Sequence, residues 1–249
     1  NGYALYDSDA LGANGGQNAL ITYNEPINLT GFTHVVLRFN QRGKLLTDTQ
    51  NFVEISTDSL NWMQYLINTD QTISVGFEEV EQLNISAIAG GQDSIFVRFR
   101  FIGLWEYAWL IDDVQIIEQP ENDIVSLSFD LTGENNEGIE YGNTPQDQLD
   151  ETYIVHSTVY NFGSEVQTAV SLSGSFQNGS TSLLFSNQAL NNLESDDTLE
   201  LFDMIDLTNI PLGAYEGNYQ LVSIEEDSAS LNFFNNIGDR NFEITSSTD

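Results

Sequence analysis

Two adjacent carboxylates interrupt the most apolar stretch of this sequence, and their chemistry suits a hard cation. Asp112 and Asp113 fall within residues 109–117, and strict alternation places Asp112 on one face with Val114 and Ile116. A carboxylate on a core face is costly unless it is paired or bound to a metal. Because the chain has six Lys and Arg residues against 38 Asp and Glu, structural calcium, which prefers oxygen ligands, is the favoured partner. The alternative is that these carboxylates accept backbone N–H bonds at the end of a strand.

Three arginines form a second group of candidate residues. Arg38, Arg98 and Arg100 each lie opposite the apolar face of their own predicted strand, and Glu54 has the equivalent position in another strand. If these strands are neighbours, the face could bind a carbohydrate through polar and aromatic side chains. The alternative is cross-strand ion pairing on a solvated or covered sheet, with each pair contributing less than ~1 kcal/mol.

Aromatic side chains near the Gly103 turn could contact a ligand. Trp105 and Tyr107 are candidates for stacking on a sugar ring, and packing at a domain interface is the alternative. Trp109 is expected in the core. Trp62 closes a predicted hairpin and is expected to be structural.

Nothing in the sequence points to catalysis. The two histidines, His34 and His156, lie in separate strand patterns without a second histidine at ligand spacing. The sequence has no HExxH, GxSxG, P-loop or GxGxxG motif. The absence of cysteine excludes disulfides, thiolate metal sites and cysteine nucleophiles. We therefore expect a protein that is not an enzyme.

The net charge of −32 restricts the partners. A nucleic-acid partner is not expected, because phosphate binding needs a basic surface. Membrane insertion is not expected either, since no run approaches 18 apolar residues. Such a charge keeps a protein soluble in a salty exterior, and it also supplies ligands for calcium.

The periodicity of the sequence predicts an all-β fold. Residues 94–101 place Ile95, Val97, Phe99 and Phe101 on one face, and segments 33–39, 52–56 and 109–117 are also expected to be strands. In the second half, strands are predicted at 124–131, 153–160, 166–172, 181–185, 199–207, 217–224 and 242–245, with a long surface loop at 133–150. No helical apolar stripe appears.

Charge and turn residues divide the chain into two domains. Residues 1–118 contain 15 acidic and 5 basic residues, whereas residues 119–249 contain 23 and 1. A polar segment with Pro120 separates the halves. We predict a jelly-roll domain at 1–118 and an immunoglobulin-like sandwich at 122–249.

The first half resembles the choice-of-anchor J, or cleaved-adhesin, domains, which are MAM-like. The resemblance rests on Asp7-Ser8-Asp9-Ala10-Leu11-Gly12, on the hairpin 53–62 and on the closing segments 97–103 and 109–114. The hairpin has Asp58-Ser59-Leu60 where the family favours Asp-Gly-Gly. Family domains begin one or two strands earlier, which leaves open that this domain lacks its first strands. In that family a calcium ion ties the closing aspartate to the early loop, so the resemblance implies the metal ligands Asp7, Asp9, Asp112 and Asp113.

The second half resembles bacterial cell-adhesion-related immunoglobulin-like domains through residues 155–163, 217–221 and 235–236. Together these observations favour an adhesion or display segment of a larger secreted or cell-surface bacterial protein. Its partners would be an extracellular glycan or protein surface and the flanking domains. Two alternatives stay open: a carbohydrate-binding accessory module of a secreted hydrolase, and a structural subunit of an extracellular filament or sheath.

Overall fold

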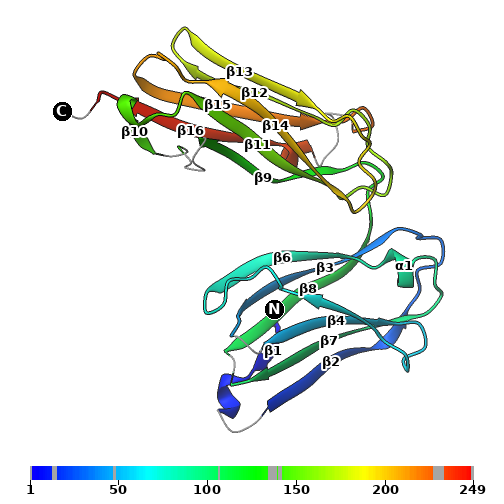
Figure 1. Cartoon of the computed structure of the whole chain (residues 1–249). Coiled ribbons are helices and arrows are strands. Elements are labelled where there is room, and N and C mark those ends of the chain that lie inside the picture. The colour runs from blue at the N-terminus through cyan, green and yellow to red at the C-terminus, as the bar shows by residue number, and fades with distance from the viewer. Residues whose placement is uncertain are drawn as a thin grey trace. The chain divides into compact units, whose positions relative to one another are not determined.

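The computed structural model describes residues 2–12, 16–46, 49–105, 107–133, 139, 142–226 and 233–247. The chain separates into two compact units, Asn1–Gln119 and Pro120–Asp249 (Figure 1). Almost all regular structure in both units is β-strand, which confirms the all-β prediction. No helix in the described part of the chain is long and apolar enough to span a bilayer.

The described residues of unit 1 contain eight antiparallel strands in two sheets. The strands are β1 (Ala4–Asp7), β2 (Gly16–Ile27), β3 (Val35–Lys44), β4 (Gln50–Ser56), β5 (Met63–Ile67), β6 (Gly76–Asn84), β7 (Ile95–Leu104) and β8 (Ala108–Glu118), with short helices η1 (Asp9–Leu11) and α1 (Ser86–Ala89). The sheet orders are β1-β8-β3-β6 and β2-β7-β4-β5, which is the strand order of an eight-stranded jelly roll. These strands all come from residues 4–118.

Alternation along β7 supplies the centre of this core. Val97, Phe99 and Phe101 are buried between the two sheets, as the sequence predicts. Tyr6 ties β1 to them: its ring stacks 5.4 Å from Trp109, and its hydroxyl donates to the Phe99 carbonyl oxygen at 2.7 Å. The side chain of Trp109 is completely buried, which agrees with its predicted core position.

Unit 2 is a second sandwich, in which the described residues form a three-stranded and a five-stranded sheet. The elements are β9 (Ile124–Gly133), β10 (Asn143–Pro145), η2 (Gln146–Gln148), β11 (Thr152–Asn161), β12 (Ser171–Asn178), β13 (Thr181–Gln188), β14 (Thr198–Asp206), β15 (Gly213–Val222), η3 (Phe233–Asn236) and β16 (Ile237–Thr245). The sheet orders are β14-β11-β9 and β10-β16-β15-β12-β13. Tyr215, near the start of β15, donates its hydroxyl to the Pro211 carbonyl oxygen at 2.9 Å, which is the tyrosine corner of immunoglobulin-like domains.

Two predicted segments of unit 2 need correction. The strand predicted at 166–172 begins only at Ser171, because Ala169 has a φ of +50° that interrupts extended backbone. Within the loop predicted at 133–150, residues 134–138, 140 and 141 lie outside the described residues. Asn143–Pro145 of the same segment form β10, which pairs in parallel with β16.

Candidate functional site

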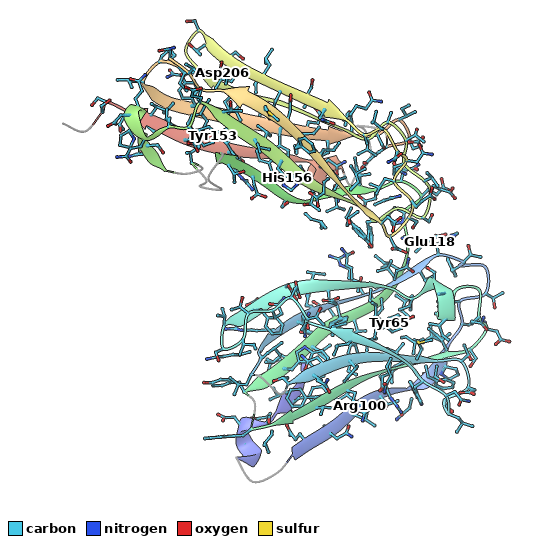
Figure 2. All side chains as sticks on the ribbon, viewed as in Figure 1. Tyr65, Arg100, Glu118, Tyr153, His156 and Asp206 are labelled. Carbon is cyan, nitrogen blue, oxygen red and sulfur yellow. The ribbon has the colours of Figure 1, made fainter. Side chains whose placement is uncertain are left out.

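The outer face of the β2-β7-β4-β5 sheet brings several polar side chains together. Arg98 and Arg100 lie on β7, on the face opposite the core. The register places Glu54 of β4 directly between Arg98 and Gln64 of β5. With Trp62 from the β4–β5 hairpin, these five residues form what we call the arginine face. Figure 2 labels Arg100 on this sheet.

Glu54 organises the arginine face because its side chain is fully buried between charged and polar partners. Its carboxylate contacts the Arg98 Nε and lies 3.4 Å from the Arg100 Nη1. Gln64 Nε2 donates to the Glu54 Oε1 at 2.5 Å. A buried carboxylate with charged donors on two sides holds them in fixed orientations, since releasing either one would leave the buried charge less fully compensated.

The hairpin turn between β4 and β5 positions Trp62. Asp58 accepts hydrogen bonds from the backbone N–H of Asn61 at 2.7 Å and of Leu60 at 2.8 Å. Together with the Asn61 side-chain amide, these donors hold the pKa of Asp58 well below its usual range. Ser59 takes the left-handed conformation that the turn requires, and Trp62 Nε1 donates to its carbonyl oxygen at 3.2 Å. The indole therefore lies over Arg98, 3.8 Å from the guanidinium carbon to the ring centroid.

Arg98 keeps hydrogen-bonding capacity in this arrangement. Its Nε is used by Glu54, whereas its two terminal nitrogens have no hydrogen-bond partner among the described residues. The Nε of Arg100 donates to the Asn18 Oδ1 at 2.8 Å. The half-exposed side chain of Leu20 lies opposite Arg100 in β2. The face thus offers fixed planar donors, an indole and apolar surface within one patch.

The other predicted ligand-binding residues do not join this face. Arg38 belongs to β3, in the opposite sheet, so the proposed group of three arginines is divided between the two sheets. Trp105 follows the end of β7, with a φ of +55° and an exposed ring. Tyr107 lies two residues further on, and Lys44 Nζ is 4.0 Å from its ring centroid. Trp62, expected to be only structural, occupies the place by Arg98 instead.

The four predicted calcium ligands lie in two separate places. Asp7 pairs with Ala108, and the backbone N–H of Asp9 donates to the Tyr107 carbonyl oxygen at 3.2 Å. Asp112 is four residues further along β8 than Ala108, about 13 Å at the usual rise of a strand. This separation does not fit one ion shared by both ends. In the described parts of the chain, no three His, Cys, Asp or Glu side chains are close enough to hold a metal ion.

The prediction that Asp112 faces the core is wrong, and a β-bulge explains why. Before the bulge, the buried residues of β8 are Trp109 and Ile111, so Asp112 points to solvent. Asp113 has a φ of +50°, and the pairing with β3 shifts at this point by one residue. The inserted residue inverts the alternation. Asp112 Oδ1 accepts from the Asp113 backbone N–H at 2.9 Å, and Asp113 Oδ2 accepts from Asn40 Nδ2 at 2.8 Å.

A polar cluster lies beside the core of unit 1. Gln41 is 2% exposed, and its Nε2 lies 2.9 Å from the Glu79 Oε1 and 3.1 Å from the Glu81 Oε2. The Gln41 Oε1 accepts from Trp109 Nε1 at 2.9 Å. Burial, together with the charges of Glu79 and Asp70, raises the pKa of Glu81 to about 7. This cluster was not predicted from the sequence. The segment Glu78-Glu79-Val80-Glu81 nevertheless places the carboxylates of Glu79 and Glu81 on one face of a strand.

His156 lies on the outer face of the β14-β11-β9 sheet, where Figure 2 labels it. Its Nδ1 is 3.7 Å from the Asp130 Oδ2, and its Nε2 contacts a carboxylate oxygen of Glu200. Asp130 of β9 lies directly opposite His156, whereas Glu200 of β14 lies opposite Thr158, two residues further along β11. The histidine therefore joins three strands through cross-strand pairs.

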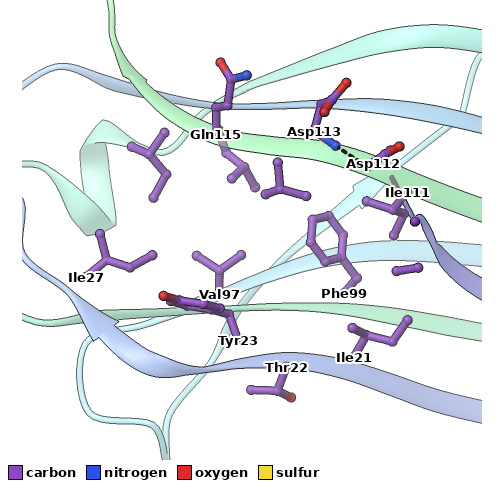
Figure 3. Close-up of a pocket in the computed structure, with 15 residues that line it drawn as sticks. Ile21, Thr22, Tyr23, Ile27, Val97, Phe99, Ile111, Asp112, Asp113 and Gln115 are labelled. Atoms are coloured by element: carbon purple, nitrogen blue, oxygen red, sulfur yellow. Dashed lines mark hydrogen bonds between the residues drawn. The ribbon is translucent and has the colours of Figure 1, made fainter.

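A cavity of about 580 Å³ opens between β8 and β2 of unit 1. Figure 3 shows Val97 and Phe99 of β7 between the segment carrying Ile111 and the segment carrying Ile21. Most of its lining is apolar and belongs to the core of the sandwich. The cavity is on the opposite side of the β2-β7-β4-β5 sheet from the arginine face, because Val97 and Phe99 alternate with Arg98 and Arg100 along β7.

Comparisons with known proteins give only distant likenesses. No family model and no curated protein matches the chain. Among solved structures, Bacteroides uniformis beta-glucuronidase 2 is 12% identical over 96% of this chain and 28% of its own, with a TM-score of 0.42. A GH2 beta-galacturonidase from Eisenbergiella tayi is 10% identical over 96% of this chain and 36% of its own, with a TM-score of 0.37. Bifidobacterium dentium beta-glucuronidase is 10% identical over 92% of this chain and 39% of its own, also at 0.37.

The chain therefore spans well under half the length of these glycoside hydrolases. The low identities and TM-scores carry no argument about activity.

Proposed function

We propose that unit 1 is a carbohydrate-binding module and that the arginine face is its binding surface. The observation that carries this proposal is the position of Arg98, whose guanidinium is held between the ring of Trp62 and the buried carboxylate of Glu54. A guanidinium fixed on both sides binds a ligand with little further loss of side-chain entropy. The proposal assigns no catalytic step to the chain.

The chemistry of this face matches that of a sugar. The planar donors of Arg98 and Arg100 suit pairs of oxygen acceptors, such as neighbouring hydroxyls or a carboxylate. Leu20 lies opposite Arg100, and Leu66 lies beyond Phe52 in the same row; each is 49% exposed and offers apolar contact to the C–H groups of a pyranose ring. The terminal N–H groups of Arg98, which have no hydrogen-bond partner among the described residues, favour glycans that carry acidic groups.

Within this proposal, the chain is an accessory segment of a larger secreted or cell-surface bacterial protein, and unit 2 is an immunoglobulin-like spacer. Two consecutive sandwiches without a long intervening linker support a modular, extracellular arrangement. The same observation favours a second candidate function, adhesion or display, in which the arginine face would bind a glycan or a protein of another surface.

Binding to immobilised polysaccharides tests the proposal. The parent protein should be retarded by affinity electrophoresis in gels containing a neutral glucan or polygalacturonate. Arg98→Lys retains the positive charge but removes the planar guanidinium group. Trp62→Ala removes the indole ring that orients this guanidinium. Each variant should weaken binding about tenfold, the loss expected for one charge-assisted hydrogen bond.

Arg38→Lys is the matched control, because it makes the same change on the opposite sheet. It should bind as the parent does. A parent that binds no member of a broad glycan panel would refute the proposal, and so would an Arg38→Lys variant that loses as much binding as Arg98→Lys.

A further inference from the structure

Two carboxylates of unit 2 are buried close to each other. Asp123 immediately precedes β9 and is 3% exposed, and Glu226 follows β15 and is 7% exposed. Burial raises the pKa of Glu226, hydrogen bonds from Ile124 and Asn236 oppose this shift, and the negative charge of Asp123 adds to it. The two carboxylates are therefore near enough for their charges to repel each other.

Hydrogen bonds join both carboxylates to the same two segments of the chain. The Asp123 Oδ1 accepts from Asn235 Nδ2 at 3.1 Å. The Glu226 Oε2 accepts from the next residue of each segment, from the Ile124 backbone N–H at 3.1 Å and from Asn236 Nδ2 at 2.8 Å. The start of β9, the segment after β15 and the helix η3 thus meet around two acidic groups.

Two more oxygen atoms of this group are buried without a donor. None of the residues that the structure describes gives a hydrogen bond to the Glu226 Oε1 or to the Asn236 Oδ1. Asn236 is 0% exposed, and its amide nitrogen already holds it against the Glu226 carboxylate. Since a buried oxygen without a partner is costly, the two atoms indicate a ligand that binds to oxygen lone pairs.

A basic side chain does not supply that positive charge to Glu226. Arg240 is the only Lys or Arg residue after position 118. Its Nε donates to the Phe129 carbonyl oxygen at 3.1 Å. The charge that acts on Glu226 is instead the like charge of Asp123. A cation from solution is therefore the partner that suits this group of oxygens.

We propose that Asp123, Glu226 and Asn236 form a calcium site in unit 2. Calcium prefers carboxylate and amide oxygens, and one divalent ion balances the charge of two carboxylates. Calcium takes about six to eight oxygen ligands, and water would supply those that the three side chains do not. The ion would join the start of β9 to η3 and so fix the segment that leads into β16. This site is separate from the aspartates of unit 1.

Hydrogen exchange of the full chain with and without calcium tests this proposal. The protein is first freed of metal with a chelator. It is then compared at equal ionic strength in sodium chloride alone and in calcium up to about 10 mM, above the dissociation constants of extracellular calcium modules. At about a hundred times the dissociation constant, the Ile124 amide should exchange about a hundredfold more slowly, because its hydrogen bond to Glu226 must open first.

Glu226→Gln and Glu225→Gln make a matched pair of variants. Glu226→Gln keeps an oxygen that can accept from Ile124 but removes one ligand charge, so half-maximal protection should need about tenfold more calcium, or more. Glu225→Gln removes the same charge from the preceding residue, whose carboxylate contacts Thr168 instead. This control should need the same calcium concentration as the parent.

Three results would overturn the proposal. The first is exchange of the Ile124 amide that does not depend on calcium, and the second is an effect of Glu225→Gln as large as that of Glu226→Gln. The third is a Glu226→Gln variant that keeps the full calcium response. The first result would assign the two oxygens to a buried water or to a proton on Glu226. Because it is measured on the parent protein, it is decisive even where a variant does not fold.

Discussion

Glu81→Gln should stabilise unit 1 at alkaline pH, because the ionised carboxylate of Glu81 is partly buried and lies near other negative charges. Its pKa is raised from 4.5 to about 7, first by burial and then by the charges of Glu79 and Asp70. This difference corresponds to about 3 kcal/mol. Since Glu81 is only partly buried, solvent screening reduces the expected effect to about 1–2 kcal/mol. The neutral amide oxygen of glutamine can still accept the hydrogen bond from Gln41.

The sign of the pH dependence follows from proton linkage. Between pH 4.5 and 7 the folded protein retains a proton on Glu81 that the unfolded chain has released. The free energy of unfolding therefore falls as the pH rises through this window. The stabilisation of Glu81→Gln should be close to zero at pH 4.5 and reach its full size by pH 8.

Urea unfolding followed by tryptophan fluorescence measures this effect in unit 1 alone, because Trp62, Trp105 and Trp109, the three tryptophans of the chain, all lie there. Glu78→Gln is the matched control. It removes the same charge three residues earlier in β6, where the carboxylate is 75% exposed, and should change stability by less than ~0.5 kcal/mol. The reasoning fails if Glu81→Gln is less stable than the parent at pH 8, or if the control gains as much.

Two further predictions concern the other elements. Tyr215→Phe removes the hydrogen bond to Pro211 and should destabilise unit 2 by about 1–2 kcal/mol, measured by calorimetry; an unchanged transition of unit 2 would show that the tyrosine corner contributes nothing. Calcium binding by the aspartates stays a prediction. Because Asp7 and Asp112 are too far apart to share one ion, Asp7→Asn and Asp112→Asn should have additive effects on any calcium-dependent shift in Tm. Coupling above ~0.5 kcal/mol between the two substitutions would instead indicate one shared ion.

The sequence alone determined the fold class and much of the core. Period-2 alternation identifies the buried face of β7 from Ile95 to Phe101, because successive side chains of a strand point to opposite faces whatever its neighbours are. The hairpin around Asp58 could also be predicted, since an aspartate accepting nearby backbone N–H groups stabilises a turn locally. Arg98 and Arg100 were correctly placed opposite the core for the same reason.

Only the tertiary structure decided which of these faces meet. Alternation specifies a face within one strand but not the sheet that the strand joins, so the sequence could not separate Arg38 from Arg98 or bring Trp62 over Arg98. A single inserted residue reverses alternation, and the bulge at Asp113 therefore turned Asp112 to solvent against the prediction.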